Sequence, residues 1–227
     1  MSSITSNWFM VGLDLLMITY TLWVLSLSNN NKFHYGIGGG LCIWLVLLYL
    51  GLSTNSLFPE DISGIMFLII IFAVAGVVGL LILAVPAVKT IVLGLNQQQL
   101  LLMQGIRVFF GASFLMQASL GNMPLVFGIV DGWTHIAAGF FGLIAAFSME
   151  SNTDAVRRAW FANLFGLLDI LIVASSLSLV ILHDITPHGS MMYAVFLPAP
   201  LFLWFHLISI WKLMQKEEIH SLQQTRS

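Results

Sequence analysis

The chain has 227 residues, of which 59% are hydrophobic and only 8% are charged, and its mean hydropathy is +0.95. A soluble domain carries about 25% charged residues, so this composition is that of a membrane protein. The net charge of −2 gives no indication of nucleic-acid binding. The single cysteine, Cys42, has neither a disulfide partner nor a CxxC neighbour, so it indicates no redox chemistry and no metal site.

Seven apolar runs are long enough to cross a bilayer as helices, because a hydrocarbon core of about 30 Å needs about 20 apolar residues. The first run lacks the basic segment of a cleaved signal peptide, so it is interpreted as a permanent span. Pro86 is expected to end or kink the third span. Short loops predict a single all-α bundle over residues 1–213 and a short tail at 214–227. The expected spans are 8–28, 35–55, 63–86, 98–120, 125–148, 159–183 and 190–213.

Lysine and arginine predict how this bundle is oriented, since they favour the cytoplasmic side of a membrane. With seven spans, the odd-numbered loops and the carboxyl-terminal tail lie on one side, and the loops on the other side contain no lysine or arginine. The amino terminus is therefore expected outside and the tail in the cytoplasm. The basic residues that define this side are Lys32, Lys89, Arg157, Arg158, Lys212, Lys216 and Arg226.

One arginine and three acids, Arg107, Asp14, Asp131 and Asp169, fall in the interior of the expected spans. A charge at the centre of a span costs about 2.5–3.5 kcal/mol on insertion scales, so such groups face the bundle interior and find partners. Helix rise places Arg107, His135 and Asp169 about ten residues, or roughly 15 Å, into their spans. An Arg107–Asp169 pair is therefore expected where their two helices are neighbours.

The fifth span carries Asp131 and His135 four residues apart, so both lie on one face together with Ala138 and Gly142, and Thr134 lies beside them. On the sixth span, Asn163 and Asp169 are about 120° apart, so only one of them is expected to face the same cavity. The candidate ligand-binding residues are Arg107, Asp131, His135, Asp169, Gln104, Asn163, His206 and Asp14.

Glycines on the fourth and fifth spans predict close packing of these helices: Gly105, Gly111, Gly128, Gly132, Gly139 and Gly142. A further run, GIGGG at 36–40, lacks the preceding strand and the βαβ setting of a nucleotide-binding loop. It therefore indicates no cofactor.

Short motifs in the second half of the chain form a recognisable series: Arg107 with Gly111 and Phe114; Pro124, Asp131 and Gly139; Trp160, Asn163 and Gly166; Phe196, Leu197 and Pro198; and His206 before Ile208. Over about residues 98–212 this pattern resembles an uncharacterised family of bacterial multi-span membrane proteins. The resemblance implies a multi-pass protein of the bacterial cytoplasmic (inner) membrane. It also singles out Arg107, Asp131, Asn163 and His206, and it implies no chemistry.

The buried charges favour a cavity near the bilayer midplane that binds or passes a small polar ligand, an ion or a proton, as in a transporter or a sensor. In this interpretation Arg107 binds an anionic group or pairs with Asp169, and Asp131 and His135 exchange protons toward the outside. The expected partners are the lipid bilayer and this ligand, with no nucleic acid. Seven helices without an internal repeat are few for a carrier, so a homo-oligomer is left open.

Two alternatives remain open from the sequence. His135 and His206 are the midspan histidines that a membrane haem protein would use as axial ligands. Asp131, His135 and His206 would form the site of a metal-dependent intramembrane hydrolase, and the loop residues His183, Asp184 and His188 form a second cluster of potential metal ligands. A non-enzymatic role is favoured, and no catalytic residue is assigned. A rhodopsin is excluded, because no lysine lies in the middle of a span.

Overall fold

The structure is a computed structural model that describes residues 3–27, 33–59, 61–149, 154–185 and 189–224. Within these ranges all regular secondary structure is helical. Seven helical segments are long and apolar enough to cross a membrane, which confirms the expected all-α class and the number of spans. The segments lie close to the expected bounds, at Thr5–Ser26, His34–Ser53, Gly64–Ala84, Gln97–Ser119, Leu125–Ser148, Ala155–Asp184 and Met191–Gln215.

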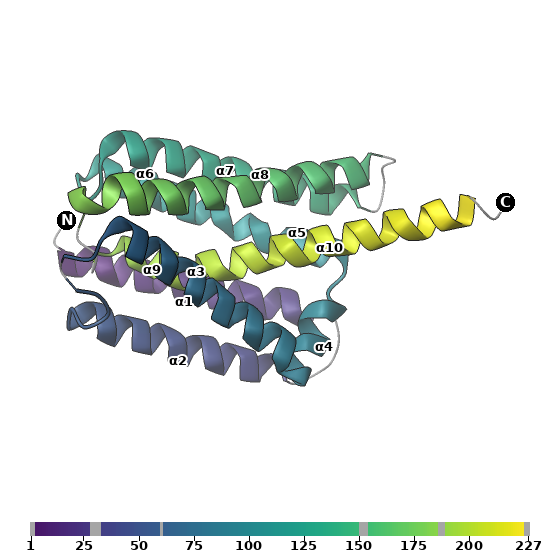
Figure 1. Cartoon of the computed structure of the whole chain (residues 1–227), viewed down its shortest axis with the longest axis horizontal. Helices are drawn as coiled ribbons and strands as arrows, with labels where there is room; N and C mark the ends of the chain where they lie inside the picture. Colours follow the sequence, from purple (N-terminus) through teal and green to yellow (C-terminus); the bar gives the residue numbers. More distant parts are fainter. Residues whose placement is uncertain (1–2, 28–32, 60, 150–153, 186–188, 225–227) are drawn as a thin grey trace.

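The helices form a bundle in which α6, α7 and α8 pack side by side and α1 packs on α2 at the opposite side (Figure 1). Helix α10 runs between these groups, contacts α3, α5 and α8, and projects beyond the bundle at its carboxyl end. The α-helices are α1 (Ser3–Ser26), α2 (His34–Ser53), α3 (Gly64–Ala84), α4 (Pro86–Gly94), α5 (Gln97–Leu102), α6 (Arg107–Ser119), α7 (Leu125–Ser148), α8 (Ala155–Ser176), α9 (Met191–Phe196) and α10 (Pro198–Gln224).

Several spans are interrupted, and the interruptions have identifiable causes. Helix α3 ends at Ala84 and α4 begins at Pro86, which confirms the break expected at this proline. In the seventh span, α9 ends at Phe196 and α10 begins at Pro198. The carbonyl of Phe196 accepts a hydrogen bond from Trp44 Nε1 at 2.9 Å. This bond compensates the break, because lipid offers no donor to a free carbonyl.

The fourth span is not the uniform α-helix that the sequence predicts. After α5 the chain forms a 3₁₀ turn at Met103–Ile106, and α-helical geometry resumes at Arg107. The sixth span also departs from α-helical geometry, because α8 continues as a π-helical segment at Leu177–Ile181. Such segments inside a helix often mark functional or strained sites.

The last helix extends beyond the expected end of the seventh span at residue 213. Helix α10 continues to Gln224, so most of the expected tail is helical. Near the end of the bundle, Lys212 Nζ donates hydrogen bonds to the carbonyls of Leu93 at 2.7 Å and Leu95 at 2.6 Å. The lysine thereby joins α10 to the carboxyl end of α4, where a cation is favourable.

The bundle is apolar on its outer surface and polar at its centre. Large apolar side chains are strongly exposed, for example Val126 at 76% and Phe147 at 69%. Arg107, Asp14 and His206 are fully buried. Extended apolar surface around buried charges is the arrangement expected of a protein surrounded by lipid.

Glycines bring α6 and α7 into close contact, as the sequence predicts. A Cβ atom at Gly111 would lie 2.8 Å from the backbone nitrogen of Ile136, and one at Gly139 would lie 2.9 Å from the backbone nitrogen of Val108. Because backbone atoms cannot move aside as flexible side chains do, no larger residue fits without separating the two helices. This packing holds the α7 residues Asp131 and His135 close to the helix that carries Arg107.

Gly111→Ala is expected to lower the free energy of unfolding by about 1–3 kcal/mol, because the added methyl group overpacks the α6–α7 contact. Gly76→Ala is the matched control, since a Cβ atom at that position would meet nothing within 4 Å. The measurement is the unfolding transition of the purified protein in detergent. Equal losses for the two variants would contradict the role given to Gly111.

Candidate functional site

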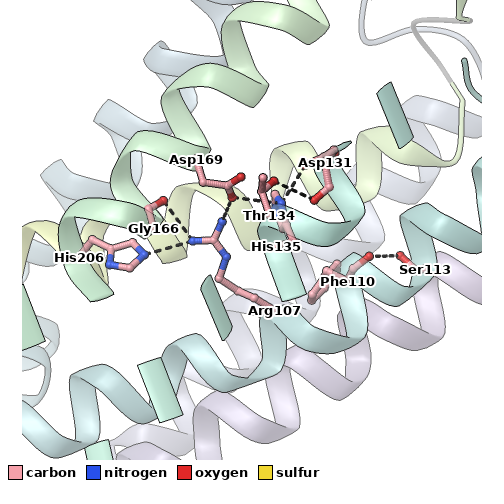
Figure 2. A network of polar contacts seen from close by, with 9 residues as sticks. All are labelled: Arg107, Phe110, Ser113, Asp131, Thr134, His135, Gly166, Asp169 and His206. Carbon is pink, nitrogen blue, oxygen red and sulfur yellow. Dashed lines mark hydrogen bonds and ion pairs between the residues drawn. The ribbon is translucent and has the colours of Figure 1, made fainter. Parts of the chain in front are cut away.

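Arg107 is the centre of a buried polar cluster between α6, α7, α8 and α10 (Figure 2). Its Nη2 atom forms an ion pair with Asp169, which confirms the pair expected from their equal depths. Its Nη1 atom donates to the carbonyl of Gly166 at 3.2 Å and lies 3.1 Å from His206 Nε2. The Phe202 ring lies 5.3 Å from the guanidinium carbon and adds a cation–π contact.

Gly166 allows the α8 backbone to approach this guanidinium. A Cβ atom at this position would lie 3.1 Å from Arg107 Nη1 and still closer to the ring of His206. The Gly166 carbonyl has two lone pairs, so it accepts from Arg107 in addition to any bond within the helix. The glycine is therefore part of the arginine site.

The hydrogen bonds of His206 define its tautomer. A guanidinium can only donate, so His206 Nε2 accepts from Arg107. The Nδ1 atom then carries the proton and donates to Asn163 Oδ1 at 3.0 Å. Asn163 Nδ2 donates to the carbonyl of Ala159 at 2.8 Å and to Ser209 Oγ at 2.7 Å. His206 is thus a neutral imidazole with both ring nitrogens occupied.

Asn163 and Asp169 both join the cluster, but of the two only Asp169 lines the hollow beside Asp131, which agrees with the expectation that one of them faces the cavity. Asp169 contacts Arg107 directly, and Asn163 reaches it through His206. Asn163 and Asp169 are nearly two turns apart on α8, and the arginine side chain and the histidine ring together span this distance. Ser209 also belongs to the cluster and is not among the residues predicted from the sequence; it lies three residues after His206 and therefore on the same face of α10.

A second group of polar atoms lies on the other side of Arg107 and comprises Asp131, His135 and Asp169 (Figure 2). His135 Nδ1 lies 2.8 Å from Asp131 Oδ1 and 3.1 Å from Asp169 Oδ2. All three side chains are largely buried, with the imidazole 10% exposed. Among the described residues, neither Asp131 oxygen has a partner with hydrogen-bond geometry, and neither does His135 Nδ1. These atoms therefore lie close together but do not form hydrogen bonds with one another.

The charges of the cluster do not balance. The single positive charge of Arg107 faces the negative charges of Asp131 and Asp169, while His206 is neutral. With a neutral His135 as well, one net negative charge remains in a low-dielectric interior, where an uncompensated charge is costly. With a neutral His135, the cluster therefore lacks one positive charge at the side where Asp131 and His135 lie, and a proton on His135 or a bound cation would supply it.

Three hollows reach this incomplete side of the cluster. The largest encloses about 210 Å³ between α7 and α8, with Asp131, Thr134 and Asp169 among apolar side chains such as Phe127 and Leu168. Two smaller hollows of about 50 Å³ and about 40 Å³ touch His135. Each is large enough for at least one water molecule. The site thus has room for a small ligand beside its unsatisfied atoms.

Two candidate residues lie outside the cluster. Asp14 on α1 is fully buried, and its carboxylate has no hydrogen-bond partner among the described residues; it interacts electrostatically with Tyr193 of α9. The Gln104 amide is also buried without such a partner, and its stem packs where Gly142 leaves room. Neither side chain contributes to the contacts of Arg107.

The structure does not bring together the ligands of the two alternative sites. The guanidinium of Arg107 lies between His135 and His206 (Figure 2), and the free lone pair of His206 accepts from it. The histidines are therefore not placed as a pair of haem ligands, and Asp169 takes the place expected for His206 beside Asp131 and His135. In the loop, His183 and Asp184 form an exposed pair at 3.5 Å, and His188 lies outside the described residues.

Arg107→Met is expected to lower the free energy of unfolding by about 3–5 kcal/mol, because it leaves buried carboxylates without their cation. Asp169→Leu is expected to destabilise the protein in the same way, because it leaves the buried arginine without its counter-ion. The double variant should lose less than the sum of the single losses, because it removes both charges of the pair. Unfolding transitions of the three variants in detergent measure this coupling. Additive losses would show that the pair does not determine stability.

Comparison with known proteins identifies the family of this chain. Residues 64–214 match the sequence pattern of a family described as "Domain of unknown function (DUF8737)". None of the curated proteins and none of the solved structures matches the chain. The matched region runs from α3 into α10 and contains the whole Arg107 cluster, whereas Asp14 lies outside it.

Proposed function

This chain belongs to the DUF8737 family, and we propose that its buried cluster binds or passes a small polar ligand, above all a proton or another small cation, near the bilayer midplane. The observation that carries the proposal is that two buried carboxylates, Asp131 and Asp169, lie beside a single arginine. Arg107 compensates one of two carboxylates, and the oxygens of Asp131 have no hydrogen-bond donor among the described residues. A cation held between Asp131, His135 and Asp169 would neutralise the cluster.

Features of the surrounding helices support exchange of this ligand with the outside. The hollow between α7 and α8 leads to Asp131 and Asp169, and smaller hollows touch His135. The 3₁₀ turn directly before Arg107 and the break at Pro198 interrupt two helices of the site. Interrupted helices near the middle of a bilayer are a recurring feature of ion and substrate sites. A transporter or a sensor fits these features.

The proposal includes a location in a bacterial cytoplasmic membrane, with the amino terminus outside and the carboxyl terminus in the cytoplasm. The seven spans support an integral membrane protein. In the structure, α4, the start of α8 and the end of α10 lie at the same end of the bundle (Figure 1). These segments carry Lys89, Arg157, Arg158 and Lys212, whereas Lys32 and Arg226 lie outside the described residues. Basic residues favour the cytoplasmic side.

Reporter fusions in a bacterial host test this orientation. A fluorescent protein that folds in the cytoplasm, fused after Ser227, is expected to be bright, and a phosphatase that is active only outside the membrane should be inactive there. The same reporters at the amino terminus should give the opposite result. An active phosphatase at the carboxyl terminus would contradict the proposed orientation.

Asp131→Asn tests the proposed function, because it removes one negative charge with almost no change in shape. Wild-type protein in liposomes containing a pH-sensitive dye is expected to respond to an imposed pH gradient, and Na⁺ and K⁺ gradients are tested in parallel. In the variant, the rate of this response should fall at least about tenfold, because one of the two carboxylates that face the cation has lost its charge. Asp184→Asn, an exposed loop variant, is the matched control.

Binding without passage is measured on the same proteins. The unfolding temperature in detergent should depend on pH or on the added cation in the wild type and in Asp184→Asn, and this dependence should be lost in Asp131→Asn. The proposal fails when Asp131→Asn and wild type agree both in flux and in the response of the unfolding temperature.

A further inference from the structure

We infer that Asp131, His135 and Asp169 form a binding site for a divalent transition-metal ion of the zinc class. The inference rests on the proposed cation site and names its occupant. One carboxylate oxygen from each aspartate and the Nδ1 atom of His135 are the ligands. These atoms all lie within 4.8 Å of one another.

The spacing of the ligand atoms fits a metal ion. Zinc lies about 2.0–2.2 Å from nitrogen and oxygen ligands, so neighbouring ligand atoms in tetrahedral or octahedral geometry are roughly 3.0–3.4 Å apart. His135 Nδ1 lies 2.8 Å from Asp131 Oδ1 and 3.1 Å from Asp169 Oδ2. Small shifts of three side chains would bring all three atoms to bonding distance around one ion.

The same contacts are poorly explained as hydrogen bonds. His135 Nδ1 and both Asp131 oxygens are buried and lack hydrogen-bond geometry with any described residue. An unprotonated Nδ1 would face two carboxylate oxygens with its lone pair and would be repelled by them unless a proton or a metal cation lies between. The unsatisfied atoms therefore point to a ligand that the three residues share.

The donor set selects the class of ion. One imidazole and two carboxylates suit Zn²⁺ and neighbouring divalent ions such as Mn²⁺ and Fe²⁺, whereas Ca²⁺ and Mg²⁺ prefer oxygen ligands and Cu⁺ prefers sulfur. Asp131 and His135 are four residues apart on α7, so the helix presents both to one point. Arg107 holds Asp169 in position on α8, as outer-shell partners do for metal ligands.

Three protein ligands leave a coordination position open. The hollow of about 210 Å³ between α7 and α8 lies at Asp131 and Asp169 and provides space for water or another ligand there. A divalent ion would change the net charge of the cluster from −1 to +1, and a hydroxide ligand on this open side would bring it to zero. The site therefore accommodates the ion together with an anionic fourth ligand.

The test uses the full chain purified in detergent, stripped of metal with a chelator and titrated with Zn²⁺ and Co²⁺. Wild type is expected to bind about one ion per chain, with a Co²⁺ absorption spectrum and a raised unfolding temperature. X-ray absorption of the zinc-loaded wild type should show one imidazole among oxygen ligands and no sulfur.

Variants assign the ligands. Asp131→Asn and His135→Gln are expected to weaken Zn²⁺ binding by at least about 10–100-fold, the range known for the loss of even an outer-shell partner. The double variant His183→Gln with Asp184→Asn removes the exposed pair and should bind as wild type does.

The outcomes separate this inference from the proposed function. A wild type that binds no Zn²⁺ above background, or whose binding is lost only with His183 and Asp184, overturns the metal site. The proposed function survives that result when Asp131→Asn still abolishes the response to protons, Na⁺ or K⁺. Because a misfolded variant also loses binding, the X-ray absorption of wild type decides the case, and zinc without an imidazole ligand overturns the inference.

Discussion

The ion pair between Arg107 and Asp169 is the constraint on which the rest of the bundle depends. An arginine in the middle of a bilayer must be compensated, and its partner is on another helix. The pair therefore fixes α6 against α8, and the contact with His206 brings α10 to the same point. Gly166 and the glycines between α6 and α7 let the helices approach closely enough for these contacts to form.

The polar groups on the two sides of Arg107 differ in their hydrogen-bond partners and in their charge. Toward His206, both ring nitrogens and the Asn163 amide have hydrogen-bond partners, and the atoms without a partner among the described residues are Arg107 Nε and Gln97 Oε1 beyond Ser209. Toward Asp131 and His135, charges do not balance and buried atoms lack partners among the described residues. A network that only stabilised the bundle would be satisfied on both sides. The asymmetry is the physical reason for placing a ligand on one side of Arg107.

Depth along the membrane normal could be predicted from the sequence, whereas rotation about each helix axis could be predicted only in part. Span counting and helix rise placed Arg107, His135 and Asp169 at one level, and the structure brings them together. Gln104 lies three residues before Arg107, a spacing that a 3₁₀ turn keeps on one face, yet its stem packs at Gly142 of α7 and its amide has no hydrogen-bond partner among the described residues. The order of helices around the bundle is likewise not encoded in span length, so the separation of Asp14 from the cluster could not be foreseen.

The helices outside the family match still contribute to the geometry of the site. The interruption that precedes Arg107 exposes carbonyl groups at the junction of α5 and the 3₁₀ turn, and lipid cannot satisfy them. Tyr20 of α1 donates a hydrogen bond to the carbonyl of Leu102 at this junction, at 2.7 Å. Tyr20 thus stabilises the turn from which Arg107 enters the cluster. Helix α1, which lies outside the matched region, thus packs directly on the segment that sets the direction of the arginine.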